Sequence, residues 1–150
     1  MSGIVLTGDW KKLGKALAGL AALDLRGIHQ ELGEAMLDDT MEAFKQGRSP
    51  EGQTWPALSA RTLKQRRKGK GKVQMLTDSG VLRRSITAIA DAEHAEVGTN
   101  VVYAAIHQLG GQAGRGKKVT IKARPYLGLG ESTHEVEKTV EEQLRRATGL

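Results

Sequence analysis

The sequence predicts an α+β protein with a long N-terminal helix, a small antiparallel sheet and a C-terminal helix. Helical spacing of apolar residues from about 24 to 46, strand-like alternation after residue 84 and an amphipathic end after residue 130 point to this class. At 150 residues with 39% hydrophobic content, the chain can form one domain, 1–150, with a buried core. Because only 3% of residues are aromatic, we expect a core of Leu, Ile, Val and Ala.

The N-terminal part is expected to be helical. Leucines spaced four and three residues apart indicate one face of a short helix, which Thr7 or Asp9 would cap. A longer helix is predicted from about Asp24 to Gln46. We expect its paired carboxylates, Asp38 and Asp39, to lie on a solvated face. The leucines of the short helix are Leu13, Leu17 and Leu20.

The segment from Gly47 to Ser59, GRSPEGQTWPALS, is rich in turn-forming residues and is expected to be a loop. Trp55 is followed by Pro56, and we expect this pair to pin the loop to the body, because a large aromatic ring stabilises a loop by burial. Ser59 is a suitable cap for a short helix from Ala60 to about Arg67.

The middle of the chain has the features of a hairpin. RSITAIAD alternates with period two and predicts a strand, and EHAEVGT predicts its antiparallel partner across a turn near Asp91. A helical turn that ends in glycine is expected in NVVYAAIHQLGG, and a third strand in Lys118–Lys122.

The last helix is expected to begin with a capping box in STHE, in which Ser132 and Glu135 cap each other's backbone. Val136, Val140 and Leu144 form a narrow apolar stripe. Such a helix is expected to pack at an edge or against another subunit.

Positive charge is concentrated in one block. RTLKQRRKGKGK, from Arg61 to Lys72, contains seven Lys or Arg and no acid, in a chain whose net charge is +6. We expect a mobile basic segment at about 61–74 and a mobile Gly-rich loop at about 110–118. The basic segment is either a solvated loop or a contact for phosphates or acidic surfaces. The candidate contact residues are Arg61, Lys64, Arg66, Arg67, Lys68, Lys70, Lys72, Arg115, Lys117 and Lys118.

Motifs for catalysis, metals and cofactors are not found, and no catalytic residue, metal ligand or cofactor is expected. The chain has no cysteine, which excludes disulfides and thiolate chemistry and is typical of a protein made in a reducing cytoplasm. The longest early apolar run, Ala16–Leu23, is too short to cross a bilayer, and we see no secretion signal. Gly111–Lys118 matches Gly-x-x-x-x-Gly-Lys, but Lys118 replaces the Ser or Thr and a strand follows, so a phosphate loop is not expected. The four histidines, His29, His94, His107 and His134, lack metal-ligand spacing.

His107 lies in YAAIHQLGG, beside Gln108 and close to Tyr103. No acid or nucleophile accompanies it, so we expect a structural histidine, whose ring donates to a backbone carbonyl while its other nitrogen accepts. Loss of its side chain should then lower stability and leave no reaction to abolish.

Four segments in order resemble the phage virion morphogenesis proteins, the tail-completion family of Mu-like tailed phages. They cover Pro50–Ser59, Leu76–Ile86, Val97–Gly111 and Ala123–Gly128. The shared patterns include Pro-x-Gly-x-x-Trp-Pro-x-Leu-Ser, Val-Gly-Thr-Asn-x-x-Tyr-Ala-x-x-His-Gln-x-Gly-Gly and Ala-Arg-Pro-Tyr-Leu-Gly.

The resemblance implies a structural virion protein that acts in tail completion and head–tail joining, located in the tail or neck and in the host cytoplasm during assembly. Its expected partners are other tail and head-connector proteins, further copies in a homo-oligomeric ring of about six, and genomic DNA in the channel. A basic nucleic-acid-binding protein without a virion role is the alternative. The motif residues expected to hold the structure are Trp55, Pro56, Gly80, Leu82, Ser85, Gly98, Tyr103, His107, Gln108, Gly110, Arg124 and Pro125.

In this reading Arg124 pairs with a carboxylate or a helix C-terminus and aims the terminal helix, and Tyr103, His107 and Gln108 lock a helical turn beside the sheet.

Overall fold

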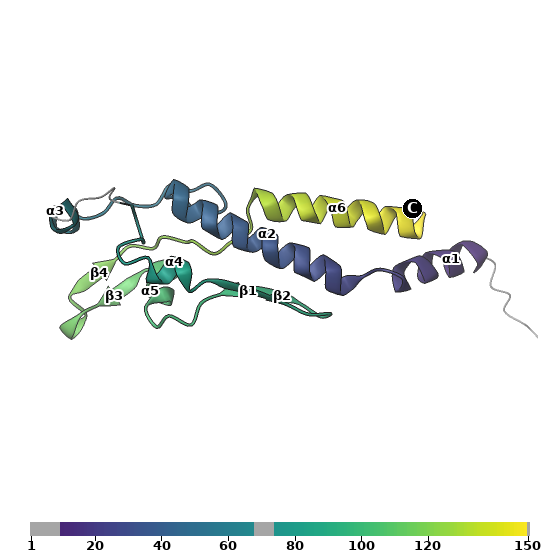
Figure 1. Cartoon of the computed structure of the whole chain (residues 1–150), viewed down its shortest axis with the longest axis horizontal. Helices are drawn as coiled ribbons and strands as arrows, with labels where there is room; N and C mark the ends of the chain where they lie inside the picture. Colours follow the sequence, from purple (N-terminus) through teal and green to yellow (C-terminus); the bar gives the residue numbers. More distant parts are fainter. Residues whose placement is uncertain (1–9, 68–73, 150) are drawn as a thin grey trace, which may run out of the picture.

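The computed structural model describes residues 10–67 and 74–149, and it confirms the α+β class (Figure 1). The helices are α1 (Trp10–Ala21), α2 (Leu25–Gln46), α3 (Ala60–Arg67), α4 (Val81–Arg84), α5 (Ala104–Leu109) and α6 (Glu131–Thr148), with a short 3₁₀ turn, η1 (Arg115–Lys117). The strands are β1 (Thr87–Ala90), β2 (Ala95–Gly98), β3 (Gly111–Ala113) and β4 (Val119–Ile121). No helix in the described ranges is long and apolar enough to cross a membrane.

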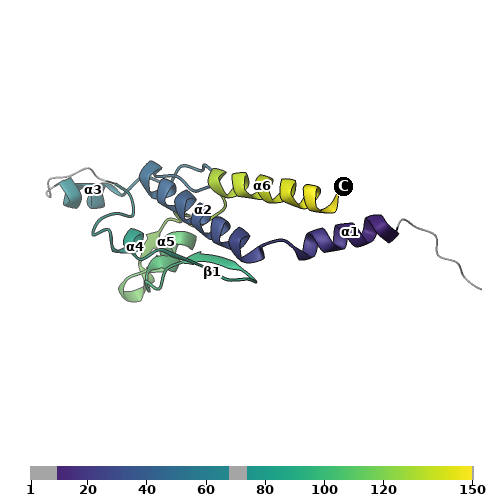
Figure 2. The same cartoon turned by 45° about the vertical axis from the view of Figure 1, so that its right-hand side comes forward.

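Helix α2 is the axis of an elongated molecule (Figures 1 and 2). Helix α6 lies along one side of α2, and the β1–β2 hairpin covers another side. Helix α1 extends past the N-terminal end of α2, whereas α3 and the β3–β4 hairpin lie at the opposite end (Figure 1). Helix α1 and the group formed by α3 and the β3–β4 hairpin therefore lie at opposite ends of the long axis.

The predicted long helix is confirmed, and its ends have clear causes. The Asp24 carboxylate caps the first turn by accepting a hydrogen bond from the Gly27 N–H at 3.0 Å. Gly47 ends the helix in the left-handed region, with φ of 68°, and its N–H donates to the Ala43 carbonyl at 2.9 Å. The expected caps of the preceding helix, Thr7 and Asp9, lie outside the described residues.

The predicted hairpin is confirmed as β1–β2, with Thr87 opposite Gly98 and Ala90 opposite Ala95. Its turn is held by the Asp91 carboxylate, which accepts from the backbone N–H groups two and three residues later. Gly33 on α2 leaves room for the small alanines of this hairpin to approach the helix.

The predicted third strand is confirmed as β4. It does not join the β1–β2 hairpin in one sheet, as the prediction of a single small sheet implied. β4 pairs with β3 in a second antiparallel pair, with Gly111 opposite Ile121. Within the predicted loop at 110–118, the structure thus contains a strand and the turn η1. The one-turn helix α4 was not predicted, because four residues are too few to show helical periodicity.

The core corrects the expectation of a purely aliphatic interior. Its centre is an aromatic cluster in which the Phe44 ring meets Trp55 edge-on at a centroid distance of 5.9 Å and Tyr126 at 5.3 Å. Leu82, Ile86 and small alanines complete it. The prediction from composition was wrong because three large rings close together bury much of the surface that a small core needs.

Candidate interaction surface

The four motif segments converge around the aromatic core. Trp55 is 3% exposed, and its indole Nε1 donates to the Pro125 carbonyl at 2.7 Å, across seventy positions of sequence. This bond joins the long loop after α2 to the segment after β4. The structure thus places Trp55 and Pro56 where the loop meets the body.

Arg124 ties the same loop a second time. Its guanidinium donates from Nε to the Pro56 carbonyl at 2.9 Å and from an Nη to the Ala57 carbonyl at 3.1 Å. The side chain is buried, at 8% exposure. A planar guanidinium matches two consecutive carbonyls because its N–H groups form a fixed fork. These contacts hold the loop, and the expected role of Arg124 in aiming the terminal helix stays a prediction.

Gln108 fixes the end of α5 to the segment after Arg124. Its side-chain oxygen accepts from the backbone N–H groups of Tyr126 and Leu127 at 2.9 and 3.0 Å, and its nitrogen donates to the Leu127 carbonyl at 2.9 Å. Gly110 follows with φ of 75°, where an added Cβ would lie 2.9 Å from the backbone nitrogen of Ala123. Only glycine fits this close approach.

His107 corrects part of the prediction. Within the described part of the chain its Nδ1 is buried and has no hydrogen-bond partner, where donation or acceptance at both nitrogens was expected. Burial lowers the pKa of His107, and the positive charge of Arg124 lowers the pKa further. The ring meets Tyr103 edge-on at 5.9 Å. Its surroundings therefore favour the neutral ring, which packs against Tyr103.

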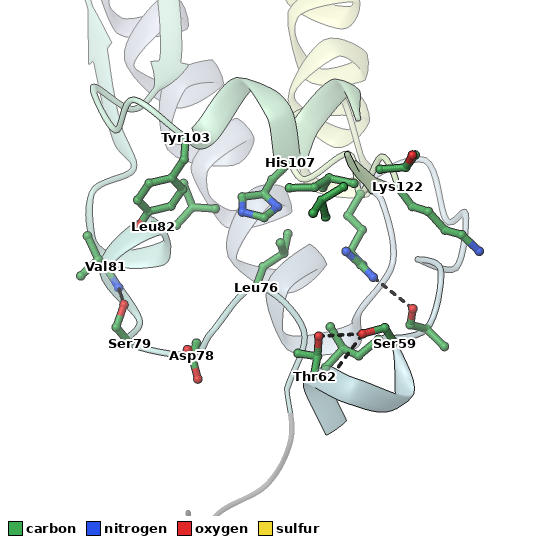
Figure 3. Close-up of a pocket in the computed structure, with 16 residues that line it drawn as sticks. Ser59, Thr62, Leu76, Asp78, Ser79, Val81, Leu82, Tyr103, His107 and Lys122 are labelled. Carbon is green, nitrogen blue, oxygen red and sulfur yellow. Dashed lines mark hydrogen bonds between the residues drawn. The ribbon is translucent and has the colours of Figure 1, made fainter. Parts of the chain in front are cut away.

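A groove of about 820 Å³ opens beside His107, and the ring projects into it between Tyr103 and Leu76 (Figure 3). Val81, Val119 and Ile121 add apolar surface to its walls. Tyr103 is 45% exposed and Val119 is 56% exposed. The groove joins the start of α3, the turn before α4, α5 and β4 into one surface.

The remaining motif residues lie in and around α4 and at the end of β2. Gly80 precedes α4 with φ of 72°, and Leu82 is buried in the core. The Ser85 hydroxyl donates to the Leu82 carbonyl at 2.8 Å and lies 2.6 Å from the Thr99 hydroxyl. Gly98 ends β2, and a Cβ added there would meet no atom within 4 Å among those considered.

The candidate contact residues within the described ranges belong to α3 and to the β3–β4 hairpin, two elements that lie at the same end of the molecule (Figures 1 and 2). Ser59 caps α3 as predicted, accepting from the Thr62 N–H at 3.2 Å. Arg66 and Arg67 belong to the last turn of α3, and Lys68, Lys70 and Lys72 lie outside the described residues. The exposed side chains that form this basic end are Arg61, Lys64, Arg115, Lys117, Lys118 and Lys122.

Asp39 is buried, whereas a solvated face was expected for it. It is 6% exposed and accepts from the backbone N–H groups of Gly130, Ser132 and Thr133 at 2.8, 2.9 and 3.0 Å, and from the Thr133 hydroxyl at 2.6 Å. Burial alone raises the pKa of Asp39, but these hydrogen bonds outweigh burial and hold the pKa below its usual value.

This carboxylate replaces the predicted capping box. Helix α6 begins one residue before Ser132, its N-cap is Gly130, and no side-chain capping bond is formed there by the cap residue. The Asp39 carboxylate, from α2, accepts hydrogen bonds from backbone N–H groups at the start of α6. Its negative charge also lies at the positive end of the α6 dipole, which is favourable. A sequence signal existed: Asp39 stands four residues from the buried Ala35 and from the buried Ala43, so the helical period puts it on the buried stripe.

Gly130 makes this contact fit. A Cβ at Gly130 would lie between 2.7 and 3.0 Å from three atoms of the Asp39 carboxylate. Gly130 has φ of −116°, which any residue can adopt. Its lack of a side chain therefore serves close approach to the carboxylate.

The described residues hold no group of three potential metal ligands. His29 contacts the Asp91 carbonyl at 3.0 Å, His134 contacts Glu137 at 2.8 Å, and His94 lies at the hairpin turn, so the histidines are dispersed. Gly111–Lys118 leads into strand β4 and not into a helix, which is the context expected for a hairpin. The motif residues act through packing and backbone hydrogen bonds, which is typical of the class of structural and assembly proteins.

The comparisons with known proteins agree with that class. The model of the phage virion morphogenesis family matches residues 9–147, and the chain belongs to this family. It is 58% identical over 54 residues to Mu-like prophage FluMu G protein 2 of Haemophilus influenzae, covering 36% of this chain and 39% of that relative. It is 36% identical over 107 residues to the "Putative capsid assembly protein G" of Escherichia phage Mu, covering 69% of each chain.

The aligned part thus spans about two fifths of the length of the Haemophilus relative. No solved structure matches the chain. Membership of this family indicates a role in phage virion morphogenesis.

Proposed function

We propose that this protein is a structural component of the phage neck that completes the tail and joins it to the head. The membership in a virion morphogenesis family and the likeness to a phage protein described as acting in capsid assembly support a position where the two parts of the particle meet. No reaction is part of this proposal.

The observation that carries the proposal is the use of the motif residues. The side chains of Trp55, Gln108 and Arg124 form hydrogen bonds with backbone atoms of distant segments. A rigid unit results, and beside it an apolar groove and a basic end remain exposed. Rigid subunits with exposed contact surfaces suit repeated assembly into a larger structure.

The expected partners are tail proteins, head-connector proteins and further copies of this chain. A ring of about six copies would match the symmetry expected of the tail. Such a ring needs a heterologous contact that closes by rotation, with different surfaces on the two sides of each subunit.

A second candidate is a nucleic-acid-binding role, which the exposed cations of the basic end favour. Lysines and arginines on α3 and η1 would contact phosphates of the genome in the channel, without base recognition. This binding should weaken steeply as salt is added.

Disruption of the gene in the parent phage tests the proposal by electron microscopy of lysates. We expect filled heads beside separate, complete tails. Tails of abnormal length would move the role to tail termination, and normal infectious particles would overturn the proposal. Mass spectrometry of purified virions is expected to find the protein at the copy number of a ring.

A further inference from the structure

Two surfaces of the molecule carry opposite charges, and the described salt bridges include none of the residues that form them. One is the basic end defined above. The other is the face along α2 and α6, where a groove runs between the helices over Ala35 and Val136. Four exposed carboxylates border this groove, and they form the acidic face: Glu31, Glu34, Asp38 and Glu135.

The geometry concentrates this negative charge. Residues 31, 34 and 38 are three and four positions apart on α2, so they share one side of the helix, and α6 brings Glu135 beside them. Among the described residues, no salt bridge involves any of the four. Like charges at this spacing repel, so a cationic surface that covers the groove would relieve the repulsion.

The basic end shows the converse. Its six cations are exposed, and none of them takes part in a salt bridge with another described residue. Val119 is also exposed beside them, which adds apolar contact area. The basic end lies at one end of the long axis, while α6 runs toward the other end, so the two surfaces do not face each other within one chain (Figures 1 and 2).

We propose that the basic end of one copy docks on the acidic face of a second copy. The occupant of the α2–α6 groove is then the β3–β4 hairpin and α3 of a neighbour. Because each copy carries both surfaces at different places, the contact is heterologous and propagates from copy to copy until it closes. The inference rests on the proposed function for the closed ring, and it adds the two surfaces that meet.

Charge exchange in purified protein tests the contact. One variant carries Glu34→Lys and Asp38→Lys, and the second carries Lys117→Glu and Lys118→Glu. The matched control carries Glu93→Lys and Glu141→Lys, which changes the net charge as the first variant does but leaves the groove intact. Sedimentation velocity at low and at high salt measures the oligomer.

We expect the wild-type chain and the control to associate at low salt and to dissociate as salt screens the contact, over a Debye length of about 10 Å at 0.1 M. Each exchanged variant should sediment as a monomer. In an equimolar mixture, the unaltered basic end of the first variant should dock on the unaltered acidic face of the second, so the two variants should associate with each other.

Three results would overturn the proposal: a wild-type chain that stays monomeric at low salt, exchanged variants that associate like wild type, or a mixture in which the two variants do not associate. A basic-end variant that loses affinity for a short DNA duplex, while the acidic-face variant behaves as wild type, would assign the basic end to nucleic acid instead. Circular dichroism verifies folding, and Glu34→Gln and Lys118→Gln replace any variant that does not fold. Sedimentation of purified protein tests this contact, whereas gene disruption tests the role in the neck, so either proposal can fail without the other.

Discussion

Asp39 and Arg124 are both buried charges, and the main chain satisfies them in opposite ways. The Asp39 carboxylate accepts three backbone N–H groups at the start of α6, whereas the Arg124 guanidinium donates to two backbone carbonyls of the loop after α2. The anion uses a helix end, whose N–H groups and dipole are ready for it. The cation uses an irregular loop, which it must itself hold in place. The comparison predicts that the anion stabilises the whole fold and the cation mainly one loop.

The largest effect is expected for Asp39→Asn. The variant leaves helix N–H groups without an anion, and it places an amide N–H₂ against them, so the free energy of unfolding should fall by about 3 kcal/mol. Urea denaturation measures this loss. Asp38→Asn is the matched control, since this neighbour is exposed; equal losses for the two variants would contradict the role of Asp39.

The stability from Asp39 should depend on pH. Its folded pKa lies below the ordinary value of 3.8, so its contribution is complete above that value and is lost as pH falls through the lower folded pKa. The difference in unfolding free energy between wild type and Asp39→Asn should therefore shrink below about pH 4. Urea denaturation at pH 6 and at pH 3 measures it, and a constant difference would show that charge is irrelevant.

The fold class, the long helix, the hairpin and the motif residues could be predicted from sequence, because periodicity and the family pattern mark them directly. The helical period indicates that Asp39 is buried, but its partners could not be predicted, since they are backbone N–H groups, which any residue provides. The same reason hid the partners of Gln108 and Arg124. The pairing of β4 with β3 was also missed, because a three-residue strand that begins with glycine leaves little alternation to detect.

A smaller effect is expected for Arg124→Lys. A lysine ammonium is a point charge that cannot reproduce the two-pronged contact with Pro56 and Ala57, and the expected loss is about 2 kcal/mol. Limited proteolysis should also cut the loop from 47 to 59 faster. Lys122→Gln, at an exposed site two residues earlier, serves as control. Unchanged proteolysis in Arg124→Lys would show that the guanidinium does not hold the loop.

The smallest effect is expected for His107→Leu. The variant removes a buried, unpartnered nitrogen, so the stability at pH 7 should change by less than about 1 kcal/mol. The folded pKa of His107 is lowered, so the wild-type chain loses stability as pH falls below about 6.5, when the unfolded chain binds a proton first. Thermal melts from pH 8 to pH 5 should show a smaller decline for His107→Leu.

His107→Ala separates packing from contact with a partner. The variant leaves a cavity, so we expect a lower melting temperature. A His107→Ala protein that melts normally but fails to assemble in phage would show instead that His107 contacts a partner in the groove.

Because Gly130 approaches Asp39 closely, these two positions, ninety-one residues apart, should coevolve. Any side chain at 130 would collide with the carboxylate, and any loss of the carboxylate would remove the reason for glycine. Relatives that keep the aspartate should therefore keep glycine at the second position, while relatives that lost the aspartate should vary freely there. A change of the aspartate should therefore precede any change of the glycine.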